Sequence, residues 1–124
     1  MAELPRRMRL SRLKGFNLQQ ASRDLNGLLA IKVDRSTPLG NPFVVGIDGT
    51  VDECVDLYEH LLAGTFCLTS KASLDAQRKA RTTALESLDE IQGMNLACWC
   101  SLGSACHGDV LLRVANSQAR EAAT

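Results

Sequence analysis

The sequence lacks any long apolar run. Within its 124 residues, no stretch approaches the roughly eighteen consecutive apolar residues that a membrane-spanning helix requires, and the N-terminal arginines are not followed by the apolar segment of a secretory signal. The sequence also lacks internal repeats, low-complexity tracts and linkers rich in proline, glycine and serine. We therefore expect a cytoplasmic protein without membrane contact, folded as a single domain over residues 1–124.

The cysteines lack the pattern of a disulfide framework. Their number, five, is odd, and three of them fall between residues 98 and 107. In a reducing compartment such cysteines remain thiols or bind metal ions, so we do not expect a small secreted fold held together by disulfides. A hydrophobic fraction of 45% with 23% charged residues predicts one ordinary globular core.

Positive charge is concentrated at the N-terminus, although the formal net charge of the chain is zero. In the first fourteen residues, five basic side chains against one acidic side chain give +4, which leaves −4 over the other 110 residues. This basic segment, residues 1–15, could contact the phosphates of a nucleotide or nucleic acid. The alternatives are a solvated tail or an edge strand protected by charge, and the alternation of residues 7–10 suits a half-exposed strand. The basic residues are Arg6, Arg7, Arg9, Arg12 and Lys14.

The first half of the chain predicts one strand, one loop and one helix. Residues 28–33 have the β-branched, apolar character of a short buried strand, and the prolines and Gly40 in residues 34–43 then stop regular structure. Thr50 and Glu53 have the spacing of a capping box. An amphipathic helix is therefore expected from Val51 to near Gly64.

The second half predicts a helix, a strand, a turn and a final helix. A helix is expected over residues 73–92, with an alanine-rich apolar face that includes Ala76, and Gly93 follows it. The apolar residues from Met94 predict a buried strand, and Ser104 is expected to cap a final helix. These elements predict a small single-domain α/β fold with a mostly parallel sheet and flanking helices.

The loop at residues 34–43, which we call the arginine loop, contains candidate ligand-binding residues. Arg35 can bind a phosphate or carboxylate through two hydrogen bonds, and Ser36 and Thr37 can donate hydroxyl hydrogen bonds. Gly40 with Asn41 allows a ligand to approach the backbone closely. The alternative is a rigid structural loop in which Asn41 bonds its own backbone.

Residues 98–107, "CWCSLGSACH", which we call the cysteine turn, contain candidate metal ligands. Cys98 and Cys100 should share one face of a strand while Trp99 points the other way. With Cys106 and His107 they have the number and type of ligands for tetrahedral zinc, or with more strain for an iron–sulfur cluster. The alternative is that these residues are buried thiols and a satisfied histidine without a metal.

A third interpretation makes the cysteine turn a ligand or active site. If Ser104 caps the final helix, the amides of residues 105–107 are free to bind phosphate or carboxylate. The helix end would also lower the pKa of Cys106, whereas Cys98 and Cys100 should have ordinary or raised pKa values. Cys106 is then the candidate nucleophile and His107 the candidate acid or base.

The two segments "RSTPLGNPF" and "LACWCSLGSACHGDVLLRVAN" together resemble the domain-of-unknown-function family numbered 4326, small proteins of bacteria and their phages. The resemblance extends to "KGF" and "VDLYEHLL", with two departures at residues 38–40 and at Ser101. It implies no established activity. The matching positions are Arg35, Gly40, Asn41, Pro42, Phe43, Cys98, Trp99, Cys100, Cys106 and His107.

Two functional hypotheses follow from the sequence. The first is a protein that binds a phosphate-bearing ligand, a nucleotide or nucleic acid, between the arginine loop and the cysteine turn. If this protein is an enzyme, it is one of phage or bacterial origin that processes the nucleotide or nucleic acid. The alternative is a non-enzymatic, zinc-stapled module that binds nucleic acid or another protein. Cys54, Cys67 and His60 are expected to lie outside any site, and the sequence leaves the reaction, substrate and oligomeric state open.

Overall fold

A three-stranded parallel sheet forms the centre of the computed structural model, which describes the backbone of residues 4–123 and the side chains of residues 4–117. The strands are β1 (Arg7–Arg9), β2 (Ala30–Lys32) and β3 (Asn95–Cys98), in the spatial order β1-β3-β2. Met8 pairs with Ala97, and Ile31 pairs with Leu96. This confirms the small α/β fold with a parallel sheet. The ends of the predicted single domain, residues 1–3 and 124, lie outside the described residues.

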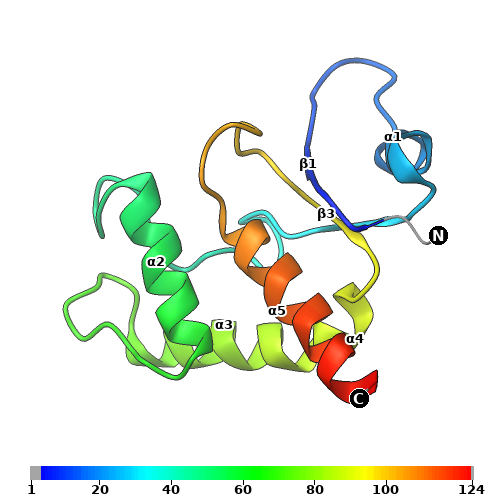
Figure 1. The fold of residues 1–124 in the computed structure, drawn as a ribbon. Helices are drawn as coiled ribbons and strands as arrows, with labels where there is room; N and C mark the ends of the chain where they lie inside the picture. Colours follow the sequence, from blue (N-terminus) through cyan, green and yellow to red (C-terminus); the bar gives the residue numbers. More distant parts are fainter. Residues whose placement is uncertain (1–3, 124) are drawn as a thin grey trace.

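Helices cover both faces of the sheet. Figure 1 shows α1 (Leu18–Asn26) on one side of the strands, and α2 (Val51–Leu62), α3 (Leu74–Glu86), α4 (Leu88–Ile91) and α5 (His107–Ala123) on the other. The face toward α1 buries a small apolar cluster around Met8 and Ala97. The opposite face carries the larger core, in which Leu96 and Cys98 pack with α2, α4 and α5. Burial on both faces explains why β3 is buried along its whole length.

The first predicted helix is confirmed with its cap. Thr50 accepts a hydrogen bond from the Glu53 backbone, and the Glu53 carboxylate accepts one from the Thr50 backbone, so the capping box is complete at the start of α2. Its inward face buries Cys54, Tyr58, Leu61 and Leu62.

The second predicted helix, residues 73–92, is divided at Ser87 into α3 and α4. Ala76, expected on its inward face, is exposed, and Gln77 is fully buried instead. The reason is polar: the Gln77 carboxamide bonds the backbone N–H and C=O of Cys67 and the C=O of Ala72. The preceding loop therefore turns the start of the helix so that the polar side chain at position 77, and not the alanine at position 76, faces inward.

The final helix begins later than predicted. Helix α5 starts at His107, and Ser104 is exposed with its hydroxyl donating to the Ser101 carbonyl oxygen rather than accepting from a helix amide. The expected Ser104 cap is therefore wrong. Among the helices of residues 4–123, none is long and apolar enough to cross a membrane.

Candidate metal and ligand site

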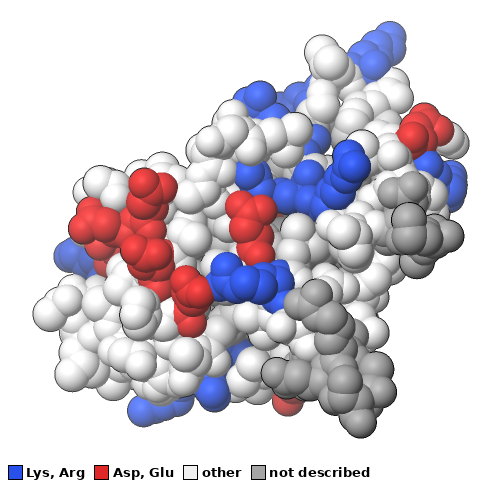
Figure 2. Space-filling view, viewed as in Figure 1, with Lys and Arg blue, Asp and Glu red and all other residues white. Residues whose placement is uncertain are grey.

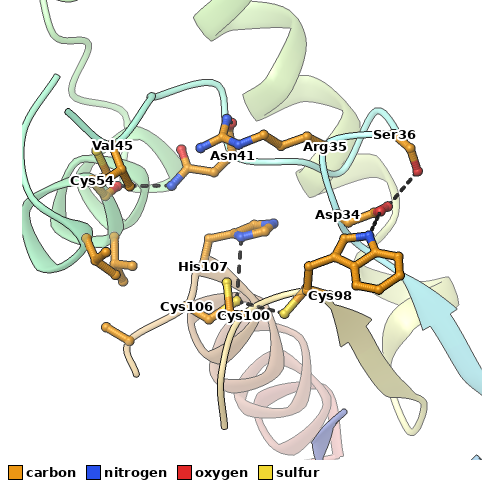
Figure 3. Close-up of a pocket in the computed structure, with 14 residues that line it drawn as sticks. Asp34, Arg35, Ser36, Asn41, Val45, Cys54, Cys98, Cys100, Cys106 and His107 are labelled. Carbon is orange, nitrogen blue, oxygen red and sulfur yellow. Dashed lines mark hydrogen bonds between the residues drawn. The ribbon is translucent and has the colours of Figure 1, made fainter. Parts of the chain in front are cut away.

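The candidate site lies where the three parallel strands end. Backbone hydrogen bonds just past the strands, from Leu10 N to Cys98 O at 2.7 Å and from Val33 N to Ala97 O at 2.8 Å, keep these ends side by side. The arginine loop follows β2 and the cysteine turn follows β3, so both reach the same edge of the sheet. They line one cavity of about 340 Å³, which confirms the prediction that they are neighbours in space (Figure 3).

Three thiols of the cysteine turn converge in this cavity. The sulfur atoms of Cys98, Cys100 and Cys106 all lie within 4.8 Å of one another, and those of Cys98 and Cys106 are 3.1 Å apart. Alternation along β3 places Cys98 and Cys100 on the same side. Cys106 reaches them from the start of α5, where its Sγ accepts a hydrogen bond from the Gly108 backbone at 3.4 Å and takes the N-cap position expected for Ser104. This thiol cluster could hold a metal ion.

The imidazole of His107 is held beside the thiol cluster by its own hydrogen bonds to backbone carbonyls. Its Nε2 lies 2.7 Å from the Val33 carbonyl oxygen and 3.1 Å from that of Leu39, and because both oxygens only accept, Nε2 carries the proton. Nδ1 is then a bare acceptor 3.8 Å from the Cys106 sulfur. Burial lowers the pKa of His107, so the ring is neutral at neutral pH. The four-ligand set expected from the sequence is therefore reduced here to three thiols, with His107 bonded beside them (Figure 3).

The thiols share a proton unequally. The hydrogen bond from Cys106 is the largest cause that lowers the pKa of Cys98 to about 6, and the Cys100 backbone N–H and the Arg7 guanidinium act in the same direction. That same bond, followed by burial, raises the pKa of Cys106. Burial raises the pKa of Cys100, in line with the sequence prediction. The hydrogen bond between the two buried thiols therefore acts against the lowered pKa that the helix end predicts for Cys106.

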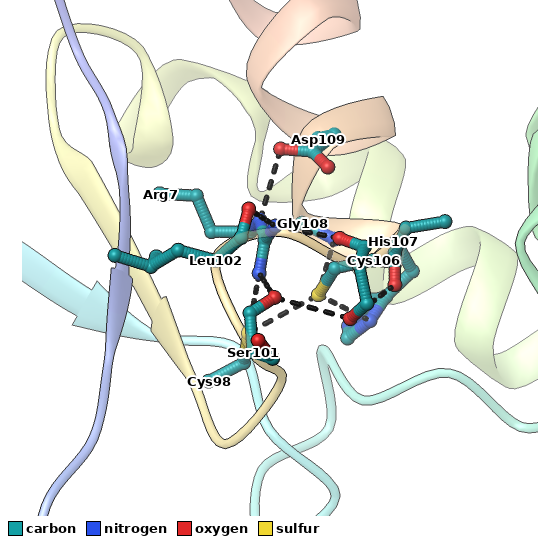
Figure 4. A network of polar contacts seen from close by, with 10 residues as sticks. Arg7, Cys98, Ser101, Leu102, Cys106, His107, Gly108 and Asp109 are labelled. Carbon is teal, nitrogen blue, oxygen red and sulfur yellow. Dashed lines mark hydrogen bonds and ion pairs between the residues drawn. The ribbon is translucent and has the colours of Figure 1, made fainter. Parts of the chain in front are cut away.

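Arg7 supports the cysteine turn from β1. Its side chain is only 7% exposed, and its guanidinium donates to the backbone carbonyls of Ser101, Leu102 and Ser104 at 3.2, 3.1 and 2.8 Å (Figure 4). Nε bonds the Asp109 carboxylate at 3.0 Å, and Nη1 lies 4.0 Å from the Cys98 sulfur. The sequence placed Arg7 among exposed phosphate contacts. The structure instead uses all five of its N–H groups inside the protein.

The arginine loop is held together by its own side chains. The Arg35 guanidinium donates to the carbonyl oxygens of Asn41 and Phe43, the latter at 2.7 Å. Asn41 is buried, accepts from the Phe43 backbone at 3.0 Å and donates to the Cys54 carbonyl at 3.1 Å. The structure therefore contains the self-bonded loop that was the alternative for Asn41. Arg35 also lines the cavity, and its ligand-binding role stays a prediction.

The other candidate residues of this loop differ in position. Ser36 lines the cavity and donates to the Asp34 carboxylate at 2.7 Å. Thr37 lies outside the lining and donates to the Asp34 carbonyl at 3.0 Å. Gly40 also lies outside it, and a Cβ there would be 2.7 Å from the Arg35 Cα. Gly40 thus lets the backbone of the arginine loop pack against its own start at Arg35. The sequence analysis had expected Gly40 to make room for a ligand.

Three residues that sequence reasoning left out of the site line the cavity: Asp34, Trp99 and Cys54, the last of which was expected to lie outside any site. Asp34 is buried, and its carboxylate accepts hydrogen bonds from Ser36 and from the Trp99 indole, the latter at 2.9 Å. Trp99, which was expected to face away from the thiols, contributes to the cavity wall with its indole bonded to Asp34. The position of Asp34 directly after a parallel strand was the available signal, because such positions commonly line sites in α/β folds.

Comparison with known proteins places the chain in a family. The family described as "Domain of unknown function (DUF4326)" matches residues 16–117, which is most of the chain, and the protein belongs to it. The matched range includes both the arginine loop and the cysteine turn, in agreement with the resemblance found in the sequence. No curated protein and no solved structure matches the chain.

Proposed function

We propose that this protein binds one zinc ion through Cys98, Cys100 and Cys106, with the fourth coordination position open to the cavity. The observation that carries the proposal is the convergence of three sulfur atoms within 4.8 Å. Tetrahedral zinc with Zn–S bonds of about 2.3 Å separates its sulfur ligands by about 3.8 Å. The thiol cluster therefore needs shifts of only about 1 Å or less to reach that geometry.

The ligand type supports zinc among the metals. Thiolates select zinc, copper(I) and iron–sulfur clusters over magnesium, calcium and manganese. Three protein ligands with an open fourth position are typical of zinc sites that act on a bound water or substrate, whereas structural sites usually have four protein ligands. The Arg7 guanidinium beside Cys98 offsets part of the negative charge that three thiolates and one zinc ion would carry.

The experiment is metal analysis under reducing conditions, because the 3.1 Å contact of Cys98 and Cys106 also permits oxidation. We expect one equivalent of zinc and, after cobalt substitution, thiolate-to-cobalt absorption with visible bands of tetrahedral coordination. Cys100→Ser should lower the affinity strongly. Cys67→Ser is the matched control, since Cys67 is also half-buried but lies outside the cluster. Failure of the purified protein to bind zinc or cobalt at stoichiometric concentration would refute the proposal.

A second candidate function uses the same cavity for a phosphate-bearing ligand, as the sequence suggested. Its support is that Arg35 and Ser36 line the cavity opposite the thiols. Arg35→Lys should then weaken binding of inorganic phosphate, because lysine cannot reproduce the two-bond contact. Isothermal titration at low salt measures this, and equal affinity of wild type and variant would remove Arg35 from the site.

A further inference from the structure

Trp99 also lines a second hollow, to which the thiol cluster does not contribute. It measures about 400 Å³ and is lined by Arg9, Leu10, Ser11, Arg12 and Trp99; we call it the basic hollow. Its lining includes two guanidinium groups and no carboxylate. The hollow exists because β1 and β3 end at the same edge of the sheet, with Arg9 paired in register with Cys98.

The tryptophan in this wall is both exposed and fixed. Trp99 is 41% exposed, and its indole N–H is held by the Asp34 carboxylate at 2.9 Å. The guanidinium of Arg12 lies 4.6 Å from the ring centroid, the geometry of a cation–π contact. A large aromatic ring held in one orientation at the surface offers a stacking platform for another planar group.

The two arginines of the basic hollow can bind an anion, Arg12 while its guanidinium lies against the Trp99 ring. Both are exposed, and neither takes part in an ion pair among the described residues. Arg7 differs from these two arginines because its guanidinium N–H groups are already hydrogen-bonded within the protein. Figure 2 shows basic side chains over the N-terminal segment, whereas acidic side chains gather over α2. The charge on this edge of the sheet therefore attracts phosphate groups.

We propose that the basic hollow binds a phosphorylated nucleoside, with the base stacked at Trp99 and the phosphate on Arg9 and Arg12. A planar aromatic group joined to an anion is the chemistry that satisfies both walls of the hollow. Such a group is present in a free nucleotide and in single-stranded nucleic acid. The proposal is independent of the zinc site, because no residue of the thiol cluster lines the basic hollow.

The chain has one tryptophan, so its intrinsic fluorescence reports on this platform directly. Titration with a ten-residue oligothymidylate or with a nucleoside monophosphate should quench Trp99, and inorganic phosphate should not. Quenching by the oligonucleotide alone identifies single-stranded nucleic acid as the ligand, and quenching by the monophosphate identifies free nucleotide. Absence of quenching by both at low salt would overturn the proposal.

Variants separate stacking from charge. Oligonucleotide binding is measured by the fluorescence anisotropy of a labelled strand. Trp99→Ala should weaken this binding by about 5- to 150-fold, whereas Trp99→Phe should retain most of the affinity. Arg9→Gln and Arg12→Gln should each reduce the slope of log affinity against log salt by about 0.7. The matched control is Arg23→Gln, an exposed arginine at the end of α1. Unchanged slopes in both hollow variants would overturn the phosphate contacts.

The zinc and nucleotide proposals fail separately. Cys100→Ser removes a proposed zinc ligand but leaves the basic hollow intact, so it should bind the oligonucleotide as the wild type does. Loss of oligonucleotide binding in a folded Cys100→Ser protein would show that the hollow is not an independent site. The far-ultraviolet circular dichroism spectrum establishes that each variant is folded.

Discussion

Replacement of Arg7 by methionine tests whether a buried arginine organises the cysteine turn. Methionine keeps an unbranched apolar stem of similar reach but removes the guanidinium. The variant loses three hydrogen bonds to backbone carbonyls of residues 101–104, the ion pair with Asp109 and the contact with Cys98. The turn then has to find other partners or move.

The loss of stability in Arg7→Met depends on whether water can replace the guanidinium at each former hydrogen-bond partner. The carbonyls and Asp109 lie at exposed positions, where water can replace the guanidinium, so the full cost of breaking a buried pair does not apply. Charge-assisted hydrogen bonds contribute about 1.5–3 kcal/mol each before such compensation. We expect a net loss of about 2–3 kcal/mol in the free energy of unfolding. At roughly 4 °C per kcal/mol for a domain of this size, the melting temperature should fall by roughly 8–12 °C.

The assay is thermal unfolding followed by circular dichroism, with Arg9→Met as the matched control. Arg9 lies two residues along β1 and is exposed, so its replacement should change stability by at most about 0.5 kcal/mol. Zinc affinity of Arg7→Met should also fall by about 10- to 100-fold, because the positive charge beside Cys98 is lost. Equal melting temperatures for the two variants would refute the role assigned to Arg7.

Three further predictions concern stability. Gly40→Ala should lower the free energy of unfolding by about 2 kcal/mol, because the new Cβ would lie 2.7 Å from the Arg35 backbone. Gly103→Ala is the control and should be near neutral, because no atom lies within 4 Å of its new Cβ. Equal denaturant midpoints for the two variants would contradict this prediction. Tyr58→Phe should preserve or raise stability by about 1 kcal/mol, since the buried hydroxyl has no partner among the described residues; a clear loss on thermal unfolding would show that it has one. Hydrogen bonds from the Val44 backbone, Ser70 and the Lys71 backbone lower the pKa of Asp48. That stabilisation is therefore present above about pH 4 and lost as pH falls through the folded-state pKa, so Asp48→Asn should destabilise at pH 7 and have little effect near pH 3 in urea unfolding.

Local spacing in the sequence determined much of the fold. The start of α2 was predictable because a capping box involves residues only three apart, Thr50 and Glu53. The strands at β2 and β3 were predictable because short apolar segments were bounded by turn residues. Because parallel strands place their carboxyl ends at one edge, the proximity of the arginine loop and the cysteine turn followed as well.

At the start of α5, the local sequence pattern offered two candidates for the N-cap residue. Ser104 and Cys106 both precede α5, and intrinsic preference favours serine as the cap. The structure uses Cys106, because packing of α5 against β3 brings its thiol to Cys98. Tertiary contacts also decided the inward face of α3. There, hydrogen bonds to the Cys67 backbone hold Gln77 inside, whereas Ala76 is exposed.

The sequence by itself therefore determined the strands, the capped helix and the composition of the site, since these depend on residues a few positions apart. Only the tertiary structure decided which side chains complete the site. Arg7 bonds carbonyls more than ninety positions away, and Trp99 bonds Asp34 across sixty-five. A buried arginine and an exposed arginine look alike in a basic segment, and the difference arises only when parallel strands bring distant backbone groups within hydrogen-bond reach.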